Sequence, residues 1–244
     1  MLKAQLIESM GSDLTVVNAA RVSFSKESEL IRTDTNKYEQ PKYGLAEADK
    51  KLIGYLANHG HWTPFSHSQI MMREKVPIFV ARQRFKHMVG FTYNEVSRRY
   101  VDDEPEFYRP DVWRSRPEGS VKQGSGDKAV IELKRDFTFS EEYNIGWTAC
   151  PNEAYQEYLY SAGGLYRNML ESGVAPEQAR MVLPQSMYTE YYVTGSLAAW
   201  ARAYKQRIDD HAQKEIQELA EQWGSIIQPL FPESWKALTK ETDA

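Results

Sequence analysis

Cysteine and long apolar runs are the scarcest features of this 244-residue chain. Its lone cysteine, Cys150, excludes a framework of intramolecular disulfide bonds. No apolar run approaches the roughly eighteen residues that a membrane-spanning helix needs, and the start Met1-Leu2-Lys3 carries no signal-peptide pattern. We therefore expect a protein of the reducing cytoplasm that has no membrane partner.

An excess of positive charge is also missing. The chain has 30 Lys and Arg against 34 Asp and Glu, a formal net charge of −4. Such a surface repels phosphate backbones except at local patches, so we expect no nucleic-acid partner. With 41% apolar residues, the chain can close one sizeable core or two small ones, and it has no repeats. We expect a single domain over 1–244.

Hydrophobic periodicity predicts a mixture of helices and strands, and hence an α+β fold. Two polar stretches, 25–44 and 102–128, lack periodicity and are expected to be loops, with a possible role as lids or subunit contacts. Strands are expected at 3–8, 66–76 and 187–194. Helices are expected at about 12–20, 46–58, 153–172, from Pro176, and at 196–223, the longest.

A cationic segment follows the second of these strands. Proline suits a first helical turn, so we expect a helix that begins at Pro77 and ends at Gly90. On such a helix Arg82 and Lys86 lie one turn apart, as do Gln83 and His87. Guanidinium, ammonium and amide donors stacked in this way suit an anionic ligand such as a phosphate.

The same segment carries a resemblance to a known family. Val80-Ala81-Arg82-Gln83, followed by Asn94-Glu95-x-Ser97-x-Arg99-Tyr100, resembles the signature region of the flavin-dependent thymidylate synthases. Further similar blocks occur in the family's order at 19–24, 59–65, 179–184 and 207–213, which together with the signature span about four-fifths of the chain. The resemblance implies a thymidylate synthase-complementing-protein-like fold, with a central antiparallel sheet flanked by helices and a long C-terminal helix.

The resemblance also implies an activity. It is the methylation of dUMP at C5 to give dTMP, with FAD as cofactor, methylenetetrahydrofolate as carbon donor and NADPH as reductant, in a homotetramer whose active sites lie at subunit interfaces. Residues that match substrate-binding positions or belong to the signature block are Gln83, Arg84, Glu95, Val96, Ser97, Arg98, Arg99, Arg180 and Arg207. Arg207 and Ser97 are the candidates for a catalytic role, although no base stands beside Ser97 in sequence, which favours binding.

Other residues match positions or segments of the flavin or folate site. They are Ser23, His61, Thr63, Lys86, His87, Met88, Asn94, Glu95, Arg202 and His211. This chain departs from the family's Arg-His-Arg motif, because Lys86-His87-Met88 stands there and Arg84 replaces a usual aromatic residue. Lysine keeps one charge, whereas methionine cannot hydrogen-bond a phosphate.

Several of these residues have simpler interpretations. His59, His61 and His67 could suggest a metal site, but their spacing without a cysteine or carboxylate is weak, and we expect no metal. Arg21 and Arg180 could pair with acids such as Asp13 or Glu177, and His211 could be a core histidine. Trp200, Tyr204 and Trp223 fit a core stripe, and the role of Tyr188, Tyr191 and Tyr192 stays open.

Cys150 bears on the reaction type. No histidine or basic cluster flanks it in sequence to lower its pKa, so we interpret it as structural rather than as an attacking thiolate. The absence of such a thiolate fits a flavin route. Two alternatives stay open: a related C5-modifying enzyme, for example one that hydroxymethylates a pyrimidine nucleotide, and a non-catalytic nucleotide- or RNA-binding protein.

Overall fold

The computed structural model describes residues 1–34, 40–118, 124–140 and 143–240, and the side chains of all of these except 134–148. The chain forms two compact units, and three segments of sequence contribute to each. Unit 1 comprises Met1, Val76–Arg82 and Glu95–Thr189; unit 2 comprises Leu2–Lys75, Gln83–Asn94 and Glu190–Ala244. The single domain expected over 1–244 stays a prediction.

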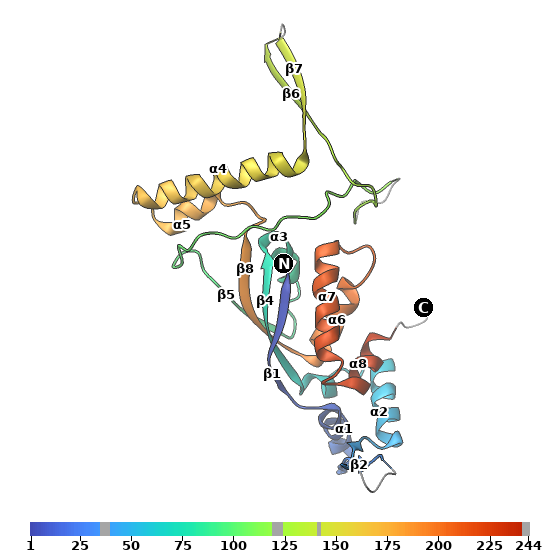
Figure 1. Cartoon of the computed structure of the whole chain (residues 1–244). Coiled ribbons are helices and arrows are strands. Elements are labelled where there is room, and N and C mark those ends of the chain that lie inside the picture. The colour runs from blue at the N-terminus through green and yellow to red at the C-terminus, as the bar shows by residue number, and fades with distance from the viewer. Residues whose placement is uncertain (35–39, 119–123, 141–142, 241–244) are drawn as a thin grey trace. The chain divides into compact units, whose positions relative to one another are not determined.

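A four-stranded sheet is the centre of unit 2. Its strand order is β1 (Lys3–Met10), β4 (Gln69–Pro77), β8 (Tyr188–Ser196) and β5 (Phe91–Glu95) (Figure 1). β1 and β4 pair antiparallel, with Lys3 opposite Lys75 and Gln5 opposite Arg73. Along β4 the side chains alternate, so that Ile70, Met72 and Glu74 are buried on one face while Arg73 points to the other.

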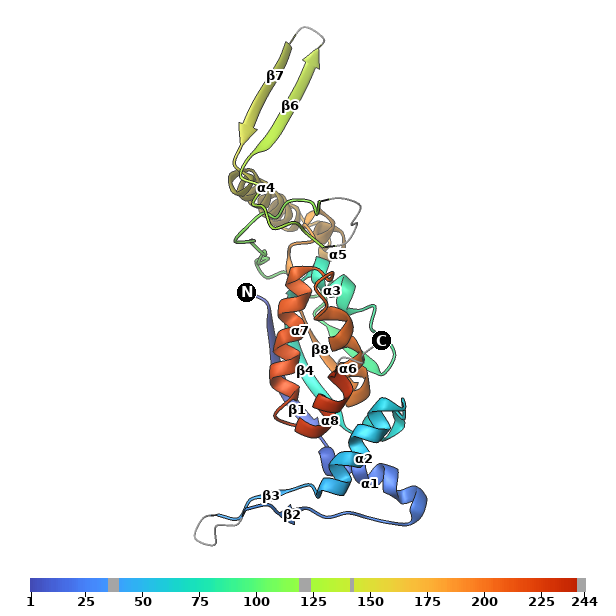
Figure 2. The same cartoon turned by 90° about the vertical axis from the view of Figure 1, so that its right-hand side faces the viewer.

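Two helices cover the buried face of the sheet. They are α6 (Leu197–Arg207) and α7 (Lys214–Ile227), and both lie against β4 and β8 in two perpendicular views (Figures 1 and 2). Trp200 and Trp223 meet there at 5.4 Å between ring centroids, and the Trp200 indole Nε1 donates to the Ile70 carbonyl at 3.2 Å. Burying each such side chain contributes on the order of 2 kcal/mol, which makes this interface the main core of the unit.

A second helical group completes unit 2. α1 (Asp13–Arg21), α2 (Glu47–Asn58) and α8 (Pro232–Thr239) pack together. The buried Asp13 carboxylate accepts hydrogen bonds from the backbone N–H groups of Glu233 and Ser234, both at 2.9 Å, and so caps α8 from another helix. Arg21 pairs with an acid, as its simpler interpretation has it, and that acid is Asp49 on α2. The shorter elements are η1 (Val22–Phe24), β2 (Ile31–Arg32), β3 (Tyr43–Gly44) and η2 (Thr63–Ser66).

Unit 1 contains the longest helix among the described residues, α4 (Pro151–Glu171). Leu159, Ala162, Gly163 and Tyr166 are its buried stripe, at the three- and four-residue spacing of a helix face. The strands β6 (Leu133–Ser140) and β7 (Tyr143–Ala149) pair antiparallel immediately before it, and α5 (Pro176–Ala179) and η3 (Arg180–Val182) follow it.

The expected α+β class, with an antiparallel sheet flanked by helices, is confirmed. The continuous helix expected over 196–223 is wrong, because the chain turns between α6 and α7. The side-chain amide of Gln217 donates to the carbonyls of Asp209, Asp210 and Ala212 and stabilises that turn. The helix expected from Pro77 to Gly90 is also too long: α3 covers Ile78–Arg84 only, so Lys86 lies beyond it.

The loops expected at 25–44 and 102–128 are confirmed in their described parts, apart from the short β2–β3 pair; residues 35–39 and 119–123 lie outside the described residues. The hairpin β6–β7 was not expected from sequence. Among the described residues, no helix combines the length and apolar character needed to cross a membrane.

Candidate functional site

A cavity of about 520 Å³ in unit 1 gathers most of the residues expected to bind substrate. Glu95 stands at the end of β5, the next four residues form the turn after it, and Arg180 comes from η3, more than eighty positions later in the chain. The cavity is lined by Ile78, Glu95, Val96, Ser97, Arg98, Arg99, Arg180, Met181, Leu183, Met187 and Thr189. Three guanidinium groups therefore line one cavity, together with a carboxylate and two hydroxyls.

Glu95 is fixed at the wall of this cavity. The Thr189 hydroxyl donates to Glu95 Oε1 at 2.7 Å, which orients the carboxylate and leaves its second oxygen for another donor. Thr189, itself buried, was not among the residues expected from sequence. No sequence signal distinguishes it from its neighbours on a strand rich in threonine and tyrosine.

Ser97 and Arg99 contact each other in the turn after β5. The Ser97 hydroxyl oxygen accepts from Arg99 Nε at 3.3 Å and from the Arg99 backbone N–H at 3.4 Å. A guanidinium is no base, so this arrangement favours a binding role for Ser97 over a nucleophilic one. The Arg98 side chain donates to the Asp103 carbonyl, and Arg180 Nε donates to the Glu177 carbonyl at 3.2 Å, so both are held at the cavity by backbone acceptors.

A separate cluster in unit 2 joins Arg207 to His87. Arg207 Nε donates to His87 Nε2 at 2.8 Å, and Arg207 Nη2 donates to the Gln83 carbonyl at 3.3 Å. Since a guanidinium only donates, His87 accepts through Nε2 and carries its proton on Nδ1. Burial lowers the pKa of His87 to about 4, with help from the charges of Arg207, Arg84 and Arg202. The imidazole is therefore neutral at physiological pH.

Arg84 does not join a ligand site, in contrast to the expectation from sequence. Its side chain is 0% exposed, and its Nε lies 3.2 Å from Oε2 of the equally buried Glu74. Because the carboxylate and the surrounding aromatic rings already hold it, the guanidinium cannot meet a phosphate without leaving the core.

Further residues expected at the cofactor lie at the surface of unit 2. Lys86 and Asn94 of the signature region and Arg202 of α6 are exposed, and Met88 is 74% exposed. Arg202 donates to the Val89 carbonyl from Nη2, which connects α6 to the segment after α3. Gln83 is held by a hydrogen bond from its amide Nε2 to Gln213 Oε1.

Four residues expected near a flavin or folate lie elsewhere in unit 2. Ser23 is in η1, Thr63 begins η2, and His61 precedes it; all three are exposed. Exposed apolar side chains stand beside them in sequence, namely Val22, Phe24 and Trp62. His211 is exposed in the turn between α6 and α7, so it lies neither in the core nor on a helix with Arg207.

The remaining histidines and Cys150 show no metal arrangement. Among residues 1–34, 40–118, 124–140 and 143–240, no three His, Cys, Asp or Glu side chains gather as a metal site would require. The His59 ring instead stacks on Tyr55 at 4.1 Å. Cys150 is a free, exposed thiol just before α4.

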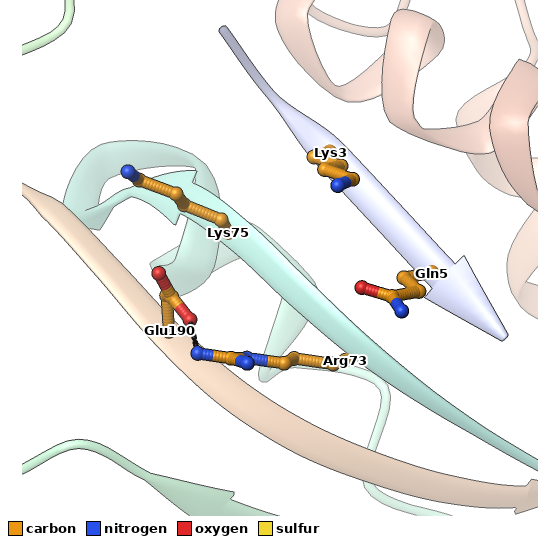
Figure 3. Close-up of a pocket in the computed structure, with 5 residues that line it drawn as sticks. All are labelled: Lys3, Gln5, Arg73, Lys75 and Glu190. Atoms are coloured by element: carbon orange, nitrogen blue, oxygen red, sulfur yellow. Dashed lines mark ion pairs between the residues drawn. The ribbon is translucent and has the colours of Figure 1, made fainter. Parts of the chain in front are cut away.

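A second cavity, of about 290 Å³, lies on the open face of the sheet in unit 2. Figure 3 shows Lys3 and Gln5 on β1, Arg73 and Lys75 on β4, and Glu190 on β8, with an ion pair between Arg73 and Glu190. None of the residues expected at a site from sequence lines this cavity.

Most of the chain matches the model of one protein family. The family model described as thymidylate synthase complementing protein matches residues 5–233. A flavin-dependent thymidylate synthase of Thermosipho africanus is 36% identical over 236 residues, which cover 97% of this chain and 90% of that protein. One from Kosmotoga olearia is 37% identical over 235 residues, with 96% and 88% covered.

A solved structure agrees with these relatives. The UMP/dUMP methylase PolB from Streptomyces cacaoi, bound with 5-Br dUMP, superposes with a TM-score of 0.70 and 28% identity. The match covers 98% of this chain and 95% of PolB.

Proposed function

The chain belongs to the thymidylate synthase complementing protein family, and we propose that it is a flavin-dependent thymidylate synthase. The reaction is the methylation of dUMP at C5 to give dTMP, with methylenetetrahydrofolate as carbon donor and NADPH as reductant. The observation that carries the proposal is the cavity of unit 1. Ser97 and Arg99 come from one sequence block that resembles the family and Arg180 from another, and all three line this cavity.

The unit 1 cavity suits a nucleoside monophosphate. Arg99 and Arg180 provide guanidinium forks for a phosphate dianion, and the Ser97 hydroxyl can donate a third hydrogen bond. The Glu95 carboxylate, held by Thr189, is an acceptor for an N–H or O–H group of the nucleotide. A volume of about 520 Å³ lies within the range of small-molecule sites.

Arg207 has a different role. Its guanidinium, fixed by His87 and by the Gln83 carbonyl, can donate to a uracil carbonyl oxygen and stabilise negative charge that develops on the ring as C5 attacks the carbon donor. Neutral His87 suits this role, because a protonated imidazole would repel the guanidinium.

The donor set fits a flavin cofactor. Ser23, Thr63, Lys86 and Arg202 offer hydroxyl and cationic donors at the surface, and Val22, Phe24 and Trp62 offer exposed apolar surface for a flat ring. Met88 offers no hydrogen bond to a phosphate, so Lys86 and Arg202 would supply the charge there. When bound there, a reduced flavin would supply the hydride needed to convert the transferred methylene group to a methyl group.

Product analysis with omission of single components tests the function. In the absence of oxygen, protein loaded with FAD and given dUMP, methylenetetrahydrofolate and NADPH should form dTMP and oxidise one NADPH per product, and omission of any one component should abolish dTMP formation. A hydroxymethylated nucleotide formed without NADPH consumption would instead support the related C5-modifying enzyme. Binding of RNA that weakens steeply with salt, without turnover, would support the binding protein.

A second substrate is favoured by one observation. The solved structure similar to this chain is that of a UMP/dUMP methylase, also determined with 5-Br UMP at 26% identity and a TM-score of 0.69. The product assay should therefore include UMP beside dUMP, and comparison of the two kcat/KM values decides which nucleotide is the substrate.

We further propose a homotetramer in the cytoplasm, with the active site completed by a neighbouring copy. The apolar side chains Tyr100 and Met181, which are next to or in the lining of the unit 1 cavity, are exposed and would be covered by another copy. Mixed oligomers of Arg207→Ala and Arg99→Ala chains should then recover part of the activity. If they recover none, each site belongs to one chain.

A further inference from the structure

A buried ion pair lies beneath the segment that carries His87. Arg84, the last residue of α3, and Glu74 of β4 are both 0% exposed in unit 2. Besides Arg84 Nε, the Glu74 carboxylate accepts a hydrogen bond from the Tyr191 hydroxyl at 2.6 Å. Both charges of such a buried pair need a counter-charge and hydrogen-bond partners, because an unpaired charge in the core destabilises the protein by several kcal/mol.

Aromatic rings enclose the guanidinium of Arg84. Its central carbon lies 4.4 Å from the Phe91 ring centroid, 4.8 Å from that of Trp200 and 4.7 Å from that of Trp223. The rings stabilise the cation through their π faces and restrict it to one position. Arg84 Nη2 has no hydrogen-bond acceptor among the described residues, so the position is set by Nε, Nη1 and the rings.

Tyr93 connects this core to His87. Arg84 Nη1 donates to the Tyr93 hydroxyl at 2.5 Å, and that hydroxyl donates to the His87 backbone carbonyl at 2.6 Å. Burial raises the pKa of Tyr93 to about 12, so its proton stays in place for this bond. The segment that carries His87 is also constrained at its other end, at Gly90. There φ is +80°, and an added Cβ atom would lie 2.9 Å from the Ala199 Cβ.

We propose that Arg84 and Tyr93 are positioning residues for Arg207, which they orient through the backbone and imidazole of His87. Arg84 fixes the Tyr93 hydroxyl, Tyr93 fixes the His87 carbonyl, and His87 then presents Nε2 to Arg207 Nε. This inference rests on the proposed function, in which Arg207 contacts the nucleotide. It assigns a role to Arg84, whose burial excludes the ligand contact expected from sequence.

The charges around His87 make the arrangement sensitive to its protonation. The cations that face it are Arg207 and Arg202 from α6 and Arg84 from α3, and the Tyr93 hydroxyl meets its carbonyl from β5. Three cations and burial disfavour the imidazolium. A segment released from Tyr93 would let the imidazole move toward water, and its pKa would rise toward the ordinary value of about 6.5.

Tyr93→Phe is the decisive variant, because it removes one hydroxyl and keeps the ring in the core. NMR of protein labelled at histidine Cε1, with His87→Gln used to assign the resonance, measures the pKa of His87 directly. We expect that pKa to rise by about one unit or more. In the FAD-loaded enzyme we expect kcat to fall about tenfold, more than the KM for dUMP changes, with a new loss of activity as the pH falls toward about 5.

Two further variants complete the experiment. Tyr155→Phe is the matched control, since its hydroxyl also donates to a backbone carbonyl, that of Tyr108, at 2.8 Å, but in unit 1. It should leave the pKa of His87 unchanged. Arg84→Lys keeps the charge but not the fork, so it should move the pKa in the same direction as Tyr93→Phe; if this variant does not fold, Tyr93→Phe alone decides.

An unchanged His87 pKa and an unchanged pH profile in folded Tyr93→Phe would overturn the proposal. The NMR measurement separates this failure from failure of the proposed function. If the protein makes no dTMP but the His87 pKa responds to Tyr93→Phe, the positioning role stands and the proposed function is wrong. The reverse result, dTMP formation without such a response, retains the function and removes the positioning.

Discussion

Arg207 donates a hydrogen bond from Nε to Nε2 of His87 over 2.8 Å, although 120 positions separate the two residues in the chain. The bond exists only while the imidazole is neutral, and burial keeps it neutral by lowering the pKa of His87 to about 4. A residue of the variant Lys86-His87-Met88 motif thereby orients the arginine that we propose to act on the pyrimidine.

The first prediction concerns stability and pH. The unfolded chain binds a proton at His87 near pH 6.5, whereas the folded chain does so near pH 4, so stability from this group is complete above pH 6.5 and is lost as the pH falls toward 4. Between pH 7 and pH 5 we expect the wild type to lose about 2 kcal/mol of unfolding free energy more than His87→Gln does. Urea unfolding at both pH values measures this, and equal losses would contradict it.

The second prediction concerns the buried pair. Glu74→Gln leaves the Arg84 cation without a counter-charge in the core and should cost about 3 to 5 kcal/mol. Glu118→Gln is the control, because it removes a pair with Lys128 in which both side chains are about four-fifths exposed (79% and 81%), and it should cost less than about 1 kcal/mol. Urea unfolding compares the two; similar small costs would show that the Arg84 site is hydrated.

The third prediction concerns the cap between α1 and α8. Asp13→Ala removes the acceptor for two backbone N–H groups at 2.9 Å and should destabilise the protein by about 1 to 2 kcal/mol. Asp13→Asn keeps an oxygen acceptor and should cost less. Thermal unfolding of both variants checks the order, and equal melting temperatures for Asp13→Ala and the wild type would exclude a capping role.

The fourth prediction concerns substrate binding. Arg99→Ala removes a guanidinium from the unit 1 cavity and should weaken dUMP binding about 10- to 100-fold, the usual effect of losing a charged hydrogen-bond partner. Arg73→Ala, on the open face of the sheet, is a control of the same residue type and should bind dUMP like the wild type. Calorimetric titration measures the Kd of each variant for dUMP. An equal increase of Kd in both variants would show that the nucleotide does not bind in the proposed cavity.

Local signals predicted most of the fold. Ser12 and Pro176 begin helices as expected, and the strand expected at 66–76 is β4, although it begins only at Gln69. The turn at 208–213 escaped prediction because Ile208 and Ile216 continue an apolar helical stripe across it. What breaks the helix is the Gln217 amide, which binds three carbonyls of the turn, and periodicity does not register such a bond.

The candidate site divides in the same way. The resemblance to the family located the residues from Glu95 to Arg99 and Arg180, which the structure brings together. Arg84, which replaces a usual aromatic residue of the family, was expected at the ligand because it stands in a cationic segment, and the sequence does not show that Glu74, ten residues earlier, faces it. Thr189 and Tyr93 act through hydroxyl contacts with residues distant from them in sequence or outside their own strand, which only the fold reveals.

A crystal structure of the protein with dUMP and FAD would show where the nucleotide binds. We expect the nucleotide phosphate in the unit 1 cavity, bonded to Arg99, Arg180 or Ser97, and the Arg207 of a neighbouring copy, still held by His87, at the uracil ring. A nucleotide bound elsewhere, with these arginines turned to solvent or to protein partners, would contradict this expectation.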